Sequence, residues 1–502
     1  MTLNEPLNPV EQIEAPLINQ DQKYQSEIEK ENQRFTKHSA LVTLLLMSIG
    51  PFSLIVQAIG EVLDMKMITQ RFEKDENSHA VEILGFTGQV GNILGYLGVY
   101  FGLSLTTRIS QLIGSGDRTT ASHLVSDVFY LTILASSIFV AAFVFVIPPF
   151  LKFMGTPDYM LKPSFTYLVP SLVMMPITNI ATIGMYYLQS IGNSILSGCV
   201  KIFTYVLQLG LFSPLFLFGF NVSTTFMKIG SILAGIVTAI VMTILMYRNK
   251  FSLHLQVGDI FDKFCPELKK ALLSSIPLIL SFLVFVLPPI LILQTMTSTD
   301  KEHSEQIGGV FAIFTTIGTI NQAIPGAFGQ SLLSAGTHAW GANNPKRLIR
   351  LFLWTLLFNG ILTFLVSLVV IPGKSLICNS FLTDPSALEL AYKMLPIPFY
   401  TSPLQGIGVT LSMLMIIVGH PLFSFITQVA QMIILCAGCK ILASKNKNDV
   451  TKVLHVYNIS DIFGFILYCV FLFIPIKEIR KKLKNPDEQR ATQGTTKLID
   501  SI

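Results

Sequence analysis

Long apolar runs with almost no charges alternate with short polar segments along most of the chain. About 20 mostly apolar residues in a helix cross a hydrocarbon core of roughly 30 Å. Because backbone polar groups in lipid must find partners within the protein, runs of this kind cross the membrane as helices. The pattern therefore predicts a polytopic α-helical membrane protein.

The runs predict twelve spans, arranged in two sets of six. They lie at about 39–63, 83–113, 121–151, 163–190, 194–220 and 224–247, and then at about 268–297, 307–339, 348–372, 388–418, 421–443 and 452–476. The polar segment 248–267 separates the two sets. We predict an all-α membrane protein with two pseudo-symmetric six-helix bundles, residues 39–247 and 268–476. The segment between them is a plain linker or an amphipathic helix on the membrane surface.

The two ends of the chain fall outside the predicted bundles. Residues 1–38 are polar and rich in acidic residues, which is typical of a mobile tail. Residues 477–502 form a second, basic tail. Lysine and arginine gather in the linker, the basic tail and the loops on the same side, so the positive-inside rule places both tails in the cytoplasm. The loop with Lys445 and Lys452 is an exception to this pattern.

Composition agrees with the membrane class. Hydrophobic residues make up 51% of the chain and charged residues 13%, against about 25% charged residues in soluble proteins. The net charge of +5 is modest and does not indicate a nucleic-acid partner. The chain contains no phosphate-binding loop of the nucleotide type, so it is not itself an ATP-driven pump.

The second half of the chain repeats landmarks of the first half. At an offset of 226 or 227 residues the following segments match: Gly114–Asp117 with Gly341–Asn344, Ser190–Asn193 with Ile417–His420, and Pro51 with Pro277. Each half has an even number of spans, so both halves enter the membrane from the same side. A pseudo-two-fold axis along the membrane normal follows, with a cavity between the halves, and this layout is typical of transporters that alternate access by rocking.

These landmarks resemble the multidrug and toxic compound extrusion (MATE) family over most of residues 40–475. The resemblance depends on Ser110–Asp117 with Ala121, Gln189–Asn193, Gly341–Arg347, Pro51 and Pro277. It implies twelve spans in two lobes and the export of organic cations or drugs, driven by inward flow of H⁺ or Na⁺.

The resemblance also implies a cation site on the first span. Family members carry an aspartate there, seven residues after a Gln-like position, and Gln57 and Asp64 keep that spacing. Glu61 lies one helical turn before Asp64 and shares its face. Two close carboxylates in a low dielectric favour protonation of one of them, so we hypothesise that protonation of this face switches the lobe. The alternative is that Asp64 lies solvated at the outer interface beside Lys66.

Two positions depart from the family pattern. Some members have Asn and Asp just before a proline of the fifth span, where this chain has Leu209 and Ser213 before Pro214. Others have a glutamate in the seventh span, near the position of Phe285. These departures favour H⁺ over Na⁺ as the coupling ion and suggest a substrate that is less charged than a typical family drug.

Several amides inside the spans are candidates for the wall of the substrate cavity, because polar groups at this depth face protein or water. They are Gln89, Asn92, Asn179, Gln208, Gln294, Asn321 and Gln322. The alternative for each is a hydrogen bond between helices, worth about 0.6 kcal/mol.

We therefore predict a secondary-active antiporter in the plasma membrane or an internal membrane. Its partners are a small organic solute, H⁺ or Na⁺ and membrane lipids, and we expect a monomer without a cofactor or a metal site. A flippase for lipid-linked sugars is a second hypothesis, but it needs cationic residues in the cavity, and the spans offer little beyond Lys201. An intramembrane enzyme is a third, but the histidines lie at span ends and in loops.

Overall fold

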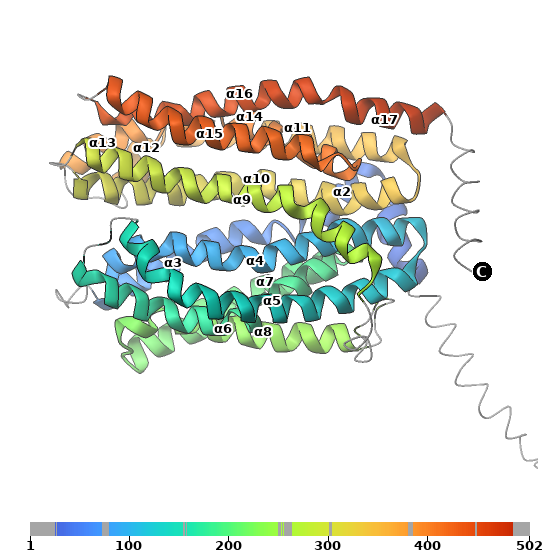
Figure 1. Ribbon diagram of the computed structural model, residues 1–502, viewed down its shortest axis with the longest axis horizontal. Helices are drawn as coiled ribbons and strands as arrows, with labels where there is room; N and C mark the ends of the chain where they lie inside the picture. Colours follow the sequence, from blue (N-terminus) through green and yellow to red (C-terminus); the bar gives the residue numbers. More distant parts are fainter. Residues whose placement is uncertain are drawn as a thin grey trace, which may run out of the picture.

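The chain folds into long, nearly parallel helices (Figure 1). The structure, a computed structural model, describes residues 26, 28–72, 80–153, 156, 158–248, 251, 253, 255, 264–300, 304–379, 385–446 and 449–484. The α-helices are α2 (Ala40–Ser48), α3 (Ser53–Phe72), α4 (Ala80–Ser115), α5 (Arg118–Phe153), α6 (Asp158–Ser190), α7 (Ser194–Leu207), α8 (Ile229–Tyr247), α9 (Pro266–Thr299), α10 (Ser304–Gly341), α11 (Pro345–Val370), α12 (Lys374–Asn379), α13 (Pro385–Met394), α14 (Ser402–Ile417), α15 (Pro421–Lys445), α16 (His455–Phe471) and α17 (Phe473–Lys484). Shorter helical segments are the π-helices η1 (Gln208–Phe212) and η2 (Leu215–Gly219) and the 3₁₀ turns η3 (Thr224–Phe226), η5 (Ile397–Tyr400) and η6 (Val450–Leu454).

Most of these helices are suited to cross a bilayer. In the described part of the chain, eight helical stretches are long and apolar enough, and the pair of α13 with η5 and α14, bent by 41°, makes a ninth. The remaining long helices, α4, α9 and α10, pack against one another in the middle of the molecule. Central helices carry more glycine and polar residues than lipid-facing ones. With these three the bundle has the twelve spans that the sequence predicts.

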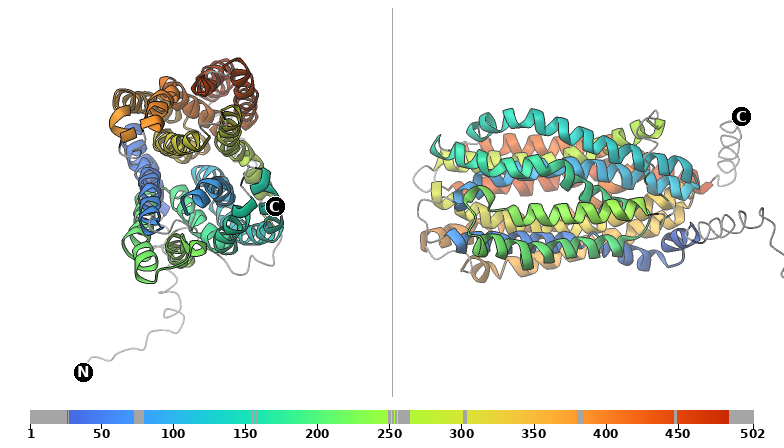
Figure 2. Two further views of the ribbon diagram at one scale, coloured as in Figure 1. Left: turned by 90° about the vertical axis from the view of Figure 1, so that its left-hand side faces the viewer. Right: turned by 90° about the horizontal axis from the view of Figure 1, so that it is seen from below.

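The helices of each half pack mainly with one another (Figure 2). In the first half α6 contacts α4, α5 and α8, and in the second half α10, α11 and α14 form one group and α9, α15 and α16 another. Across the seam between the halves, α4 contacts α9 and α10, while α2 contacts α10 and α11. These cross-contacts decide where a solute can pass.

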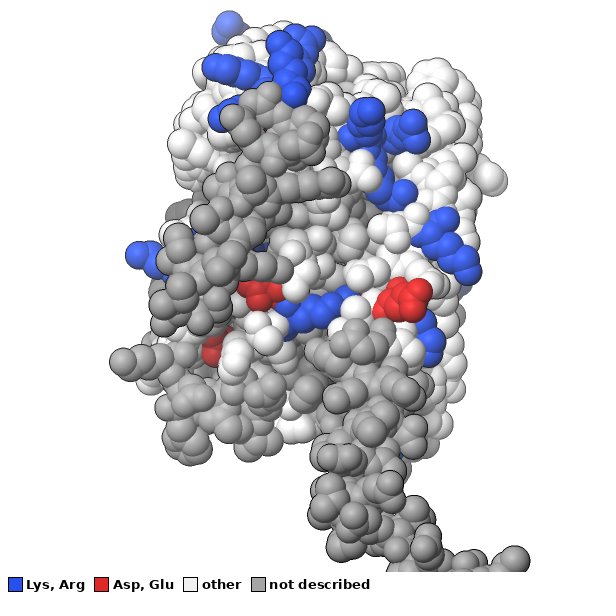
Figure 3. Space-filling model, turned by 90° about the vertical axis from the view of Figure 1, so that its right-hand side faces the viewer, with Lys and Arg blue, Asp and Glu red and all other residues white. Residues whose placement is uncertain are grey.

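Positive charge gathers at one end of the bundle (Figure 3). This end, where α4, α6, α10 and α17 finish and α2 and α11 begin, is called the basic end here. Basic residues are retained on the cytoplasmic side of membrane proteins, and this rule predicts that the basic end faces the cytoplasm. The helices therefore point their other ends to the opposite face of the membrane.

The last residues of the segment predicted as a tail are ordered against the basic end. Residues 28–36 are helical. Glu31 is fully buried and forms an ion pair with Arg118 at 2.5 Å. The ring of Phe35 is 1% exposed and stacks on His338 of α10 with ring centroids 4.2 Å apart. Two contacts therefore hold this polar segment in place. The Glu31 carboxylate binds the first half, and the Phe35 ring packs on the second half.

Most of the segment predicted as a linker lies outside the described residues, including the greater part of the stretch expected to be amphipathic. Three residues that are described, Phe251, Leu253 and Leu255, are buried in the core of the first half. The Tyr187 hydroxyl donates to the carbonyl oxygen of Leu253. At these positions the connection packs against the protein.

Candidate functional site

Asp64 is a buried carboxylate in the outer half of α3. Asp64 is only 2% exposed, although Lys66 two positions later is exposed. The Ser213 hydroxyl donates to Oδ1 of Asp64 at 2.8 Å. A carboxylate away from water is costly unless it is paired or hydrogen-bonded, so this donor belongs to a specific site. The alternative of a solvated Asp64 does not agree with this burial.

Irregular backbone brings Ser213 to the carboxylate. After α7 the chain continues as two π-helical segments, η1 and η2, with Ser213 and Pro214 between them. Insertions of this kind occur frequently at functional sites. Gly230 of α8 makes room on the other side, because a Cβ there would lie 2.6 Å from the nitrogen and the hydroxyl oxygen of Ser213. Three helices thus meet around one hydroxyl.

Glu61 is solvent-exposed, one turn before Asp64. Its Oε1 accepts a hydrogen bond from Nε2 of Gln57 at 2.9 Å. Lys201 and Tyr205 of α7, together with Tyr96 of α4, are close enough to interact electrostatically with Glu61. The predicted trio therefore divides into a hydrogen-bonded pair, Gln57 with Glu61, and a buried carboxylate, Asp64.

Lys228 is a further cation near the two carboxylates. It lies just before α8, is half-buried, and interacts electrostatically with Asp64 and Glu61. Tyr167 of α6 also interacts electrostatically with Asp64 and with Lys228. Sequence reasoning did not single out Lys228, although a lone lysine at the start of an apolar span is a detectable signal.

Three glycines on α4 border open space. Gly88, Gly91 and Gly95 are exposed, and a Cβ at any of them would meet no atom within 4 Å. They recur at a spacing of three to four residues, so they share one helix face. They lie in the outer half of α4, the helix of the first half that contacts α9 and α10 of the second half.

At the basic end the same seam is closed. A Cβ at Gly114 would lie 2.3 Å from the carbonyl oxygen of His338, and one at Gly341 would lie 2.2 Å from that of Gln111. The Ser334 hydroxyl donates to the carbonyl oxygen of Gln189 at 2.8 Å across the seam. The seam is thus closed at the basic end, and open space lies beside the outer half of α4.

A buried hydrophobic cluster reinforces this closure. It joins residues of both halves, among them Leu44, Tyr186, Phe328 and Leu414. An ion pair between Arg108 of α4 and Glu267 of α9, with Nε to Oε2 at 2.6 Å, adds a charged link.

The amides predicted for the cavity wall fall into different environments. The side chains of Gln89 and Asn92 lie outside the described part of the structure. Asn179 is buried and donates to Ser136 at 2.9 Å, and Asn321 is buried in mutual hydrogen bonds with Ser402. Both have the geometry of links between helices.

The other three predicted amides differ in exposure. Gln208 is buried at the first position of η1. Gln294 of α9 and Gln322 of α10 are exposed. Gln322 neighbours Asn321 on a helix that borders the seam, so it is the predicted amide of the second half best placed to meet a solute there.

Among the described residues of the second half, Asp461 belongs to a polar cluster inside the bundle. Oδ2 of Asp461 on α16 lies 2.7 Å from the Thr401 hydroxyl, which also lies 3.0 Å from Oδ1 of Asn458. Asp461 is half-buried. It is the acidic group of the second half that most resembles Asp64 in its surroundings.

Comparison with known proteins agrees with this architecture. The MatE family model matches residues 51–215 and again residues 277–441, and these matches cover more than half of the chain. The chain belongs to the MatE family. The two matches begin at Pro51 and Pro277, 226 residues apart, which is the offset of the internal repeat. MatE proteins are multi-pass membrane transporters rather than enzymes.

Individual MatE relatives are distant in sequence. A protein named FAD transporter from Shewanella oneidensis is 22% identical over 413 residues, which are 81% of this chain and 89% of the relative. A MOP superfamily transporter from Pyrococcus furiosus, described as having a binding pocket of reverse polarity, superposes with a TM-score of 0.78 at 15% identity, over 90% of this chain and 98% of that one. A multidrug resistance MATE transporter described as outward-facing gives a TM-score of 0.78 at 15% identity, over 89% and 98%.

Proposed function

We propose that this MatE protein is a secondary-active antiporter that exports small organic solutes by alternating access, coupled to proton entry at Asp64. The observation that carries the proposal is the buried Asp64 carboxylate, which accepts a hydrogen bond from the Ser213 hydroxyl. Ionisable groups within membrane spans are retained for ion and proton pathways. Alternating access requires two states, one open at each end. Open space beside the outer half of α4 and close contacts at the basic end agree with the state that is open at the outer end.

Coupling follows from the contrast between the two protonation states. The charged Asp64 accepts from Ser213, which links α3 to the fifth span, and Lys228 at the start of α8 lies near enough to favour the charge. A proton on the carboxylate removes that attraction and leaves a neutral group that is cheaper to bury. We propose that protonation rearranges these three helices, and that the hydrogen-bonded pair of half-buried Gln57 and exposed Glu61 leads protons to the site. Sodium is the less favoured ion, because among the described side chains the Ser213 hydroxyl is the neutral oxygen that contacts the carboxylate.

The substrate enters between the halves. The seam offers neutral amides such as Gln322, small glycine surfaces on α4 and the carboxylate of Glu61. This mixture suits a small organic cation or an uncharged amphipathic solute. The relative named FAD transporter makes a flavin nucleotide the second candidate, for which Lys201 and Lys228 would supply the positive charge.

Transport by purified protein in liposomes tests the proposal. The parent should accumulate a fluorescent organic cation under an imposed pH gradient, and Asp64→Asn should lose most of that gradient-driven uptake. Asp158→Asn is the matched control, since Asp158 lies at the start of α6 with a side chain 85% exposed. Equal uptake by Asp64→Asn and the parent would refute the coupling site. Uptake of FAD in place of the cation would select the second substrate.

A further inference from the structure

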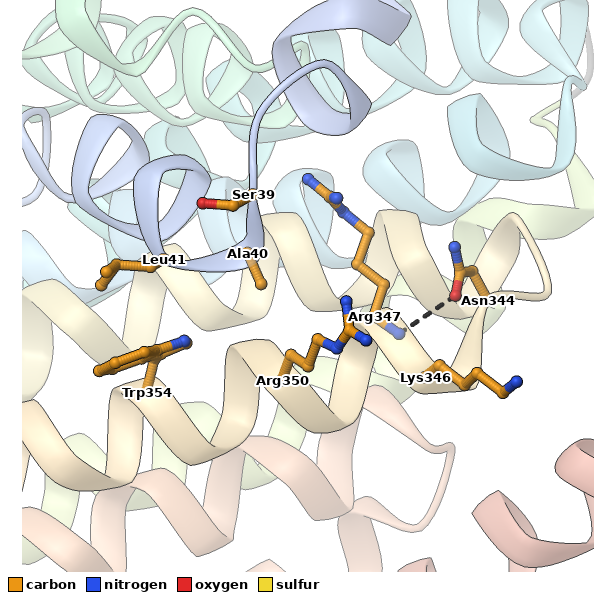
Figure 4. A pocket seen from close by; sticks show the side chains of 8 residues that line it. All are labelled: Ser39, Ala40, Leu41, Asn344, Lys346, Arg347, Arg350 and Trp354. Atoms are coloured by element: carbon orange, nitrogen blue, oxygen red, sulfur yellow. Dashed lines mark hydrogen bonds between the residues drawn. The ribbon is translucent and has the colours of Figure 1, made fainter.

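A pocket at the basic end lies where the two halves meet, on the surface away from the seam interior. It encloses about 500 Å³ between the start of α2 and the first turns of α11. Its lining residues are Ser39, Ala40, Leu41, Asn344, Lys346, Arg347, Arg350 and Trp354 (Figure 4). Ser39, Lys346 and Arg350 are exposed, so the pocket can be reached from outside the protein.

The pocket carries positive charge that no side chain of the described protein neutralises. Arg347 is occupied, since its guanidinium donates to the carbonyl oxygens of Phe35 and His38 and to the Thr43 hydroxyl. Lys346 and Arg350 make no ion pair in the part of the chain that the structure describes. Both α2 and α11 also begin here, and a helix start favours a bound anion. An anionic group is therefore the complementary ligand.

Aromatic and apolar surface continues from this charge toward the membrane. Trp354 is half-buried and stacks beside Phe358, and indole rings at such positions lie at the level of lipid headgroups. One turn further in, Leu45 on α2 is 41% exposed and Leu357 on α11 is 47% exposed. A free anion would use only the charged part of this surface, whereas a lipid uses all of it.

We infer that this pocket binds the phosphate headgroup of an anionic phospholipid of the cytoplasmic leaflet. Arg350 and Lys346 hold the phosphate, because guanidinium and ammonium groups pair strongly with phosphate oxygens. Trp354 lies beside the glycerol region, and the acyl chains follow Leu45 and Leu357. The lipid contacts α2 of the first half and α11 of the second half, so its binding stabilises the closed basic end. This site is independent of the solute path and of the proposed coupling at Asp64.

Quenching of Trp354 fluorescence by brominated lipids tests the site directly. The chain has two tryptophans, so Trp340→Phe leaves Trp354 as the only reporter. In nanodiscs of zwitterionic lipid with a small fraction of brominated phosphatidylglycerol, quenching should far exceed that by the same fraction of brominated phosphatidylcholine. Lys346→Gln with Arg350→Gln should weaken the apparent affinity roughly thirtyfold, as expected for two lost charges at the membrane surface. Lys269→Gln with Arg480→Gln removes two exposed charges elsewhere at the basic end and should leave it unchanged.

Three results would overturn the inference: equal quenching by the two brominated lipids, equal affinity in the two double variants, or displacement of the lipid by inorganic phosphate alone, which would make the site one for a soluble anion. A second readout avoids dependence on Trp340→Phe. The melting temperature of the parent should rise when phosphatidylglycerol is added to the nanodisc, and this rise should be lost only in the Lys346 and Arg350 double variant. A rise of the same size in that variant would also overturn the inference.

Discussion

At the scale of single residues, the hydrogen bond from Ser213 to Asp64 joins α3 to the irregular part of the fifth span. A hydrogen bond to a charged group contributes about 1.5–3 kcal/mol, and it is more expensive to leave a buried carboxylate without it. The hydroxyl therefore favours the charged state of Asp64 and the packing that belongs to that state.

Ser213→Ala tests this hydrogen bond. We expect proton-driven uptake to fall about tenfold, because the charged carboxylate loses its donor while the helix keeps its shape. Initial rates of uptake in proteoliposomes measure the effect. Ser137→Ala is the control, since Ser137 is exposed and donates only to a carbonyl one turn earlier in its own helix. Equal rates in the Ser213 variant and the parent would show that the hydroxyl has no part in coupling.

The residues on α3 were predictable from the sequence, but their partners were not. The spacing of Gln57 and Asp64 is visible in the chain. Ser213 stands where some family members have an aspartate, so the sequence alone shows it as a departure from the family pattern. The π-helical segments on either side of Pro214 change which side chains face α3. Only the folded backbone shows that a serine can take the place of a stronger ligand there.

At the scale of the elements, the ends of α4 and α10 decide how tightly the basic end closes. Gly114 and Gly341 each lie against a carbonyl oxygen of the other helix, at distances that no larger residue tolerates. The repeat predicted these two turns as equivalent landmarks. It did not predict that they touch each other, because the sequence does not record which repeated segments meet across a pseudo-two-fold axis.

Gly341→Ala should open the basic end. The added methyl overlaps the Gln111 carbonyl oxygen, and overpacking of this kind costs about 1–3 kcal/mol, so the equilibrium should shift roughly tenfold toward the open state. A cysteine placed at Ser334, which is 2% exposed, reports the change through maleimide labelling. Gly91→Ala, where a Cβ meets no atom within 4 Å, is the control. Unchanged labelling of Ser334→Cys in the Gly341 variant would contradict the closure described here.

The segment before α2 shows a limit of composition as a guide. Residues 28–36 are polar enough to suggest a mobile tail, yet Glu31 and Phe35 are buried. Each depends on a partner far away in the sequence, Arg118 for the carboxylate and His338 for the ring. Such pairings arise from the tertiary structure and leave no local pattern.

At the scale of the whole molecule, the twelve spans and the family were predictable because hydropathy and repeated turns are properties of the chain itself. The MatE family model matches both halves at the offset of the repeat, and solved MATE structures superpose over most of the chain. Substrate and coupling ion were not predictable in this way, because relatives at 15–22% identity share the fold without fixing individual side chains. Those features require direct measurement.

Distances across the seam test alternating access most directly. Spin labels at Thr119 and Ala342 span the basic end, and labels at Asp158 and Ser375 span the opposite end, all at exposed positions. In a variant without the six native cysteines, acidification should lengthen the first distance and shorten the second, and Asp64→Asn should abolish this response. Distances that stay constant with pH and solute, that change in the same direction at both ends, or that respond equally in Asp64→Asn would contradict the account.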